Sequence, residues 1–174
     1  MRRDGVATYE VSTSREFADL YRRAVPDVYS YLASRVGDRG AAEDLTQEVF
    51  IAGAHRAARG EVVDLRWLIA VARHKLVDHW RALAREGRKL AVVASLEPET
   101  RDVEQPLPID PGGASAALAG LNPTYRAALV LRHVDELGVP EVAGLLGRSV
   151  EATEQVLSRA RAAFRTVYQG LPHE

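Results

Sequence analysis

Residues 139–165 read VPEVAGLLGRSVEATEQVLSRARAAFR, and this stretch decides the fold of the C-terminal part of the chain. Apolar residues at helical spacing run up to Gly147, which favours a tight turn. Ser149 then suits the cap of a second, longer helix. We therefore predict a helix-turn-helix unit, which places its second helix in the major groove of DNA, although an ordinary helical hairpin has the same pattern. The wedge between the two helices is expected to contain Val142, Ala143, Leu146, Val150, Thr153 and Leu157.

The composition is that of a soluble helical protein. Of the 174 residues, 47% are hydrophobic, 27% are charged and only 6% are aromatic. The abundance of Ala, Leu and Arg favours helices over strands. The chain has no cysteine, which fits a reducing cytoplasm, and no apolar run long enough to span a membrane. It shows no glycine-rich phosphate loop and no nucleophile motif, so we expect neither an enzyme nor a cofactor.

The net charge of −1 conceals an uneven distribution of charged residues. Residues 66–89 carry seven basic and two acidic side chains. Residues 96–117 carry one basic and five acidic side chains, and residues 118–174 carry six of each. The pattern predicts a basic helix suited to phosphate and an acidic linker.

The chain is predicted to be all-α, with two small helical domains joined by a flexible acidic linker. Its divisions are a tail over 1–13, a first domain over 14–94, a linker over 95–113 and a second domain over 114–170. Pro98, Pro106, Pro108 and Pro111 argue against a packed core in the linker.

The predicted helices follow from periodicity and capping signals. In the first domain they span 14–36, 41–59 and 65–88, with Ser14 as the first N-cap and Pro26 as a kink or boundary. The third has an apolar stripe of Leu68, Ala72, Leu76, Trp80 and Leu83. In the second domain they span 114–120, 123–136, 140–146 and 150–168. Asn122 and Pro123 begin the second of these, with Leu129, Val130 and Val134 expected to face inward.

Several separated motifs resemble one known family. Residues 42–50, AEDLTQEVF, closely resemble the core-binding helix of bacterial sigma factors, and residues 17–23, FADLYRR, resemble the helix that precedes it. Residues 67–73, WLIAVAR, resemble the helix that meets the −10 promoter element. Leu121-Asn122-Pro123 and the helix-turn-helix resemble the domain that reads the −35 element. In this order and spacing, the motifs identify the chain as a member of the extracytoplasmic-function (ECF) sigma factors.

The resemblance implies a sigma factor that binds core RNA polymerase and directs it to promoters, without catalysis, cofactor or metal, in the bacterial cytoplasm. It implies polymerase binding by Asp44, Leu45, Gln47, Glu48 and Phe50. Contacts to the −10 element are implied for Arg59, Asp64, Arg66, Trp67, Arg73, His74, Lys75, Arg81 and Arg85. Contacts to the −35 element are implied for Arg148, Ser149, Glu151, Gln155, Ser158, Arg159 and Arg161. The other partners are double-stranded and melted promoter DNA and an anti-sigma factor.

Three positions depart from the family pattern. Glu154 and Val156 stand where the recognition helix often has a basic pair, and His74 stands where Asn is common. Glu151 or Glu154 would either accept a hydrogen bond from a cytosine amino group or repel DNA. Trp67 and Trp80 would either stack on unpaired bases or, the more usual role near an apolar stripe, pack in the core.

Three other functions remain open at this point. An enzyme would have to use His74, Asp78 and His79, of which the first two have the spacing of a metal pair on one helix. A stand-alone helix-turn-helix regulator would bind DNA without polymerase. A degenerate sigma paralogue would bind polymerase or a regulator without starting transcription.

Overall fold

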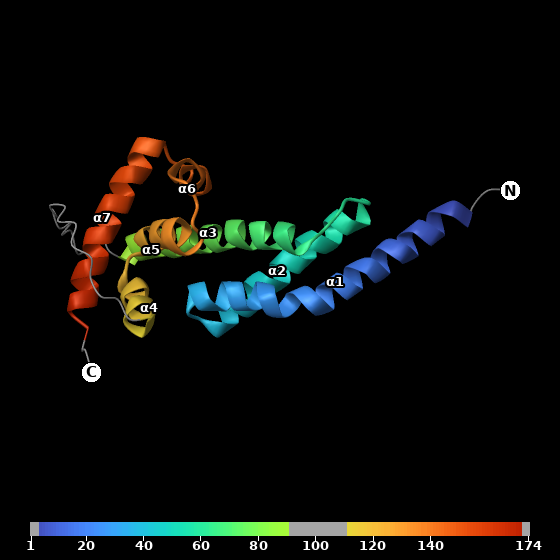
Figure 1. Ribbon diagram of the computed structural model, residues 1–174, viewed down its shortest axis with the longest axis horizontal. Coiled ribbons are helices and arrows are strands. Elements are labelled where there is room, and N and C mark those ends of the chain that lie inside the picture. The colour runs from blue at the N-terminus through green and yellow to red at the C-terminus, as the bar shows by residue number, and fades with distance from the viewer. Residues whose placement is uncertain (1–3, 91–110, 172–174) are drawn as a thin grey trace. The chain divides into compact units, whose positions relative to one another are not determined.

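The computed structural model describes residues 4–90 and 111–171, with side chains described over 15–87 and 112–171 (Figure 1). Over these ranges the chain forms α-helices and one π-helical turn, which confirms the predicted all-α class. The chain divides into two compact units, residues 1–76 and residues 77–174, with the boundary inside one helix. Most of the predicted linker lies outside the described residues. The elements are α1 (Asp4–Val36), α2 (Arg39–Ala58), α3 (Leu65–Leu90), α4 (Pro111–Gly120), α5 (Pro123–Leu129), η1 (Val130–Val134), α6 (Val139–Leu146) and α7 (Val150–Gln169).

Helix α1 begins ten residues before its predicted start. It runs from Asp4 through Pro26 to Val36, so Ser14 lies inside the helix and the N-cap predicted there is wrong. Residues 4–13 contain no proline, and a serine that can cap a helix does not prevent an upstream turn from continuing into it. Helix α2 does begin at a cap: the Asp38 carboxylate accepts a hydrogen bond from the Ala41 N–H at 2.7 Å.

The N-terminal unit forms where α1, α2 and the first half of α3 pack together. Figure 1 shows α1 and α2 running antiparallel and in contact. Val28 of α1, Val49 of α2 and Leu68 of α3 are fully buried. Gly53 permits the close approach, because a Cβ atom there would lie 3.0 Å from Phe17 Cε2 and 3.2 Å from Leu68 Cδ2. These are tighter than ordinary contacts between carbon atoms.

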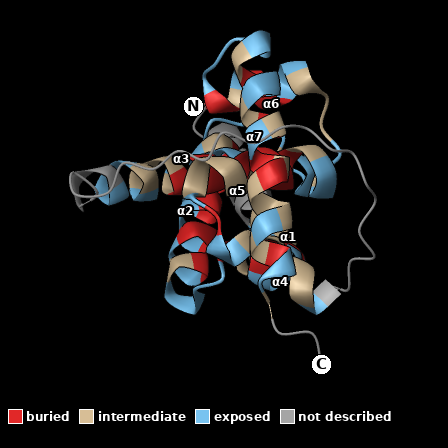
Figure 2. Cartoon of the chain, turned by 90° about the vertical axis from the view of Figure 1, so that its left-hand side faces the viewer, coloured by how far each residue is buried: buried red, intermediate tan, exposed pale blue. Residues whose placement is uncertain are grey.

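The apolar stripe of α3 is buried over most of its predicted length. Leu68, Ala72, Leu76 and Trp80 are at most 1% exposed, which places Trp80 in the core. Figure 2 shows this burial on α3 as red segments among exposed ones. Leu83 is 38% exposed, so the predicted stripe ends one turn early.

The C-terminal unit is built on α7, against which α4, α5 and α6 all pack. The sequence signals for the starts of α5 and α7 are confirmed, whereas α4 begins at Pro111, three residues before its predicted start. Asn122 accepts a hydrogen bond from the Tyr125 N–H at 2.9 Å with Pro123 at the first helical position, and the Ser149 hydroxyl accepts one from the Ala152 N–H at 3.1 Å. Between α6 and α7, Gly147 has a φ of +62°, which glycine adopts without the strain that a Cβ atom causes. Val150 is 38% exposed, so it is not the wedge residue that we predicted.

The predicted helix over 123–136 ends in a π-helical turn, η1, after which residues 135–138 are not helical. The Asp135 N–H donates to the Val130 carbonyl at 2.9 Å, which is an i to i+5 bond in place of the usual i to i+4. The extra residue in this turn shifts the helical phase. Leu131 is fully buried, as its spacing from the buried Ala127 requires, while Val134 at the end of the turn is 51% exposed, contrary to its predicted inward position.

Within the described ranges, no helix combines the length and apolar character needed to cross a bilayer.

Candidate functional site

One side of α2 carries three adjacent polar residues, which we call the acidic face. Asp44, Gln47 and Glu48 are all exposed there. Leu45 and Phe50 are only 7% and 5% exposed, so they support this face from beneath and do not lie on it. The Tyr21 ring packs edge-on against Phe50 with centroids 4.7 Å apart.

Ile51 extends the acidic face by an apolar residue at its C-terminal end. It is 56% exposed and follows Glu48 by three residues, which puts both side chains on the same side of the helix. Our sequence prediction missed this residue, although the helical spacing alone would have placed it there. Glu48 also reaches toward α3, where its carboxylate pairs with Lys75 Nζ at 2.7 Å.

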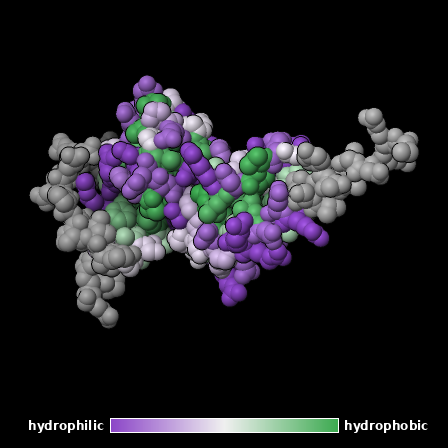
Figure 3. Space-filling view, turned by 45° about the vertical axis from the view of Figure 1, so that its right-hand side comes forward, coloured by the Kyte–Doolittle hydropathy of each residue, from purple (hydrophilic) through white to green (hydrophobic). Residues whose placement is uncertain are grey.

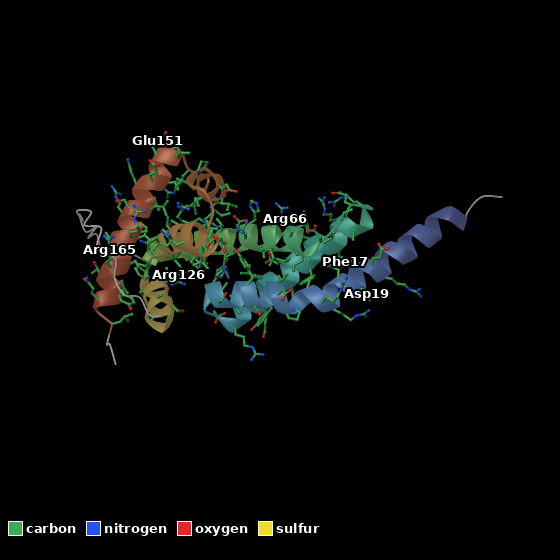
Figure 4. All side chains as sticks on the ribbon, in the orientation of Figure 1. Phe17, Asp19, Arg66, Arg126, Glu151 and Arg165 are labelled. Carbon is green, nitrogen blue, oxygen red and sulfur yellow. The ribbon has the colours of Figure 1, made fainter. Side chains whose placement is uncertain are left out.

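The basic residues of α3 differ in how far they reach into solvent. Arg66, His74 and Arg85 are exposed, and Figure 4 marks Arg66 near the start of the helix. Arg73, Lys75 and Arg81 are half-buried, and Arg81 pairs with Asp78 at 3.1 Å. In the view of Figure 3, hydrophilic residues cover much of the described surface, with apolar patches between them.

The loop between α2 and α3 is held by Arg56, a residue without a predicted role. Its Nε donates to the Val62 carbonyl at 2.9 Å, and its Nη1 pairs with Glu61 at 2.7 Å. Its guanidinium lies over the Trp67 ring, 5.1 Å from the centroid. Trp67 is half-buried, and part of its ring is covered by this cation.

The ends of this loop are also fixed. Arg59 pairs with Glu61 at 2.8 Å, and this hydrogen bond lowers the pKa of the Glu61 carboxyl below its usual value. Asp64 caps α3, because its carboxylate accepts a hydrogen bond from the Trp67 N–H at 2.7 Å. Two predicted DNA-binding residues, Arg59 and Asp64, are therefore engaged within the chain.

A shallow pocket of about 190 Å³ opens between this loop and α1. Phe17, Leu20 and Ala57 form its apolar side, and the backbone and side chains of Gly60 to Val63 form the opposite wall. Glu16 and Glu61 add carboxylates to the lining. The pocket combines an aromatic ring with hydrogen-bond acceptors, which suits a planar, polar ring such as a nucleic-acid base.

The exposed side of the helix-turn-helix carries mixed charges. Of the residues predicted to contact the −35 element, Arg148, Ser149, Glu151, Gln155 and Arg159 are exposed, while Ser158 and Arg161 are half-buried. Glu154 is exposed beside them and Val156 is half-buried. Hydrogen bonds from the Glu151 backbone and from Ser149 lower the pKa of the Glu151 carboxyl, which favours its charged form at the start of α7.

Arg126 ties α5 to the end of α4, as its place in Figure 4 shows. Its Nε donates to the Leu118 carbonyl at 2.8 Å, and its Nη2 donates to the Ala119 carbonyl. These carbonyls belong to the last turn of α4 and have no partner inside the helix. Partial burial lowers the pKa of Arg126 from its usual value, but the side chain remains a cation.

Among the described residues, no group of three His, Asp or Glu side chains gathers in a way that would hold a metal ion. His74 and Asp78 are both exposed on α3, with Asp78 paired to Arg81.

Comparison with known families matches two regions of the chain. The family described as sigma-70 region 2 matches residues 20–86, and the family described as sigma-70, region 4 matches residues 114–164. The first range contains the acidic face, the loop and most of α3, and the second contains the helix-turn-helix through most of α7.

Similar individual proteins are sigma factors by name. The chain is 29% identical to the ECF RNA polymerase sigma factor BldN of Streptomyces coelicolor over 91% of its own length, and it spans 61% of that protein. It is 28% identical to the ECF RNA polymerase sigma factor SigM of Bacillus subtilis over 86% of its length, covering 93% of SigM. The fold resembles that of the sigma factor RpoE of Bartonella quintana, solved in complex with the anti-sigma factor NepR. The TM-score is 0.54 at 19% identity, covering 91% of this chain and 99% of RpoE.

Proposed function

The chain belongs to the sigma-70 family, among the ECF sigma factors, and from this premise we propose how its surfaces share the work of starting transcription. As a sigma factor it binds core RNA polymerase and directs it to promoters. It is an initiation factor and not a catalyst. The observation that carries this function is the presence of both regions in one chain, at residues 20–86 and 114–164, in the order that the family uses.

The acidic face of α2 is the proposed contact with core polymerase. Asp44, Gln47 and Glu48 offer carboxylate and amide oxygens that suit a basic, polar partner surface. Ile51, exposed one turn beyond Gln47 and Glu48, adds an apolar side chain of the kind that stable interfaces bury. Leu45 and Phe50 act indirectly, because their burial fixes the position of this helix.

The loop before α3 and the basic side of α3 are the proposed −10 reader. The exposed Arg66 and Arg85 are suited to phosphate, with an affinity that falls as salt rises. The pocket beside Gly60 to Val63 is proposed to receive a base that leaves the stack when the promoter opens. Trp80 is buried and takes no part, while Trp67 supports the loop through Arg56.

The helix-turn-helix is the proposed −35 reader, with Arg148, Gln155 and Arg159 as exposed candidates for contact. The C-terminal residues 118–174 carry equal numbers of acidic and basic groups, so this unit alone should bind DNA weakly. The two surfaces that bind DNA weakly are expected to bind a promoter tightly when both are held on polymerase, because binding of the second surface is then intramolecular.

Regulation by an anti-sigma factor and a cytoplasmic location complete the proposal. The solved RpoE chain with the similar fold is bound to an anti-sigma factor, NepR. A bacterial polymerase subunit acts on the chromosome, which places its work in the cytoplasm.

Run-off transcription from a genomic library with purified core enzyme tests the function. We expect defined start sites that require both core enzyme and this protein, and footprints on DNA only when both are present. Footprints without polymerase would favour a stand-alone regulator. Association with core enzyme but no transcripts would favour a degenerate paralogue.

Charge reversal tests the acidic face. The double variant Asp44→Arg with Glu48→Arg should weaken association with core polymerase by about a hundredfold. The fold should persist, because Glu48 and Lys75 are half-exposed and such pairs contribute at most about 1 kcal/mol. The control Asp27→Arg with Glu86→Arg makes the same charge change at exposed sites elsewhere and should bind normally. Unchanged co-elution of the first variant with core enzyme would refute this assignment.

A further inference from the structure

Arg56 makes contacts to three different parts of the segment that leads into α3. Its Nε bonds to the Val62 carbonyl at 2.9 Å, its Nη1 pairs with Glu61 at 2.7 Å, and its plane lies over Trp67, 5.1 Å from the ring centroid. The planar fork of an arginine can serve a carbonyl, a carboxylate and an aromatic face at once. A lysine can supply only one compact charge.

Arg56 is better shielded from water than the neighbouring arginine. Its side chain is 31% exposed, whereas Arg59 is 61% exposed and is seen to hold only Glu61. Ion pairs at exposed sites contribute little, because water and salt compete with them. Arg56 therefore fixes the backbone of the loop through the Val62 carbonyl, whereas Arg59 fixes the Glu61 side chain.

The consequence for the pocket is geometric. Because Arg56 draws in the Val62 carbonyl, Glu61, Val62 and Val63 stay in place as one wall of the pocket opposite Phe17. The Val62 side chain remains 80% exposed, so the loop presents an apolar group to incoming DNA. Without the Arg56 side chain, this segment would keep the Arg59–Glu61 pair, the Asp64 cap and the backbone hydrogen bonds of the Gly60 and Glu61 N–H groups to the carbonyls of Ala57 and Arg56, but no side chain would hold the Val62 carbonyl.

We propose that Arg56 is a positioning residue that holds the loop before α3 in the form that receives an unstacked promoter base. The inference rests on the proposed function of the pocket. Arg56 acts through Glu61, Val62 and Trp67 and does not itself need to touch the base.

Abasic substitutions in a premelted promoter test this role. The promoter comes from the transcription experiment, and bases of the non-template strand in the −10 element are removed one at a time. With wild-type protein on core polymerase, we expect one position at which base removal weakens DNA binding about tenfold, the scale of one lost stacking site. With Arg56→Ala, intact DNA should bind about tenfold more weakly, and removing that base should then cost less than twofold. The control Arg39→Ala, which removes an exposed arginine paired with Glu43 on α2, should keep the full effect of base removal.

Each other outcome has a defined meaning. A full tenfold effect of base removal in Arg56→Ala would overturn the proposal, and so would a transcriptionally active wild type with no sensitive position. Loss of transcription by the wild type would instead refute the proposed function. If Arg56→Ala fails to bind core polymerase, Arg56→Lys decides: a reduced effect of base removal supports the positioning role, and an unchanged effect refutes it.

Discussion

Substituting Gly53 by alanine should destabilise the N-terminal unit, although alanine is the better helix former. In an open helix interior the exchange gains about 1 kcal/mol. At Gly53 the new Cβ atom would lie 3.0 and 3.2 Å from the Phe17 ring and 3.2 Å from Leu68 Cδ2. Leu68 is fully buried, so the overpacking should cost about 2 kcal/mol, within the usual range of 1–3 kcal/mol. The net loss of stability should then be about 1 kcal/mol.

Urea unfolding followed by tryptophan fluorescence measures this effect, because Trp67 and Trp80 both lie on α3. The matched control is Gly87→Ala, also within a helix, where an added Cβ atom meets nothing within 4 Å. That variant should gain up to about 1 kcal/mol, since only the helix preference changes. If Gly53→Ala stabilised the protein as much as Gly87→Ala, the close convergence of α1, α2 and α3 at this glycine would be refuted.

Two further predictions concern the C-terminal unit. Arg126→Ala should lower the free energy of unfolding by about 2 kcal/mol, because two carbonyls at the end of α4 lose a charged donor. Amide hydrogen exchange should then become faster in α4 than in α7. Unchanged protection of α4 would contradict this prediction. Partial loss of hydration, together with the cations Arg132 and Arg161, lowers the pKa of His133 below 6.5. The unfolded state therefore takes up a proton first, so the unit should lose stability as the pH falls through about 6.5 toward the folded pKa. His133→Gln should flatten that dependence in acid titrations of thermal stability, and an unchanged profile would assign the dependence to other groups.

Most of the helices could be predicted from local signals. Asn122 with Pro123, and Ser149 after Gly147, mark helix starts through short-range hydrogen bonds and backbone preferences, and the structure confirms both. Ser14 shows the limit of such signals. A residue that can cap a helix is also tolerated inside one, so only the upstream residues decide where α1 begins.

The candidate site was predictable as a set of faces but not as a set of contacts. Helical spacing placed Asp44, Gln47 and Glu48 together on α2, and it would equally have indicated Ile51. Arg56 could not be found in this way, because its three contacts depend on the path of the loop after α2. The Glu48–Lys75 pair likewise depends on how α2 and α3 pack, and spacing within a single helix contains no information on that.

Because a π turn over Val130–Val134 precedes the helix-turn-helix, the orientation of the helix-turn-helix depends on the number of residues in this turn and not only on their types. Each residue of an α-helix turns the chain by about 100°, so deleting one residue here would restore α-helical spacing and change the direction in which the chain leaves the helix after Val134. Substitutions in this turn should therefore be tolerated more readily than insertions or deletions. For a unit that is proposed to meet DNA through one side of α7, we expect a single-residue deletion to misdirect this helix even where the packing recovers.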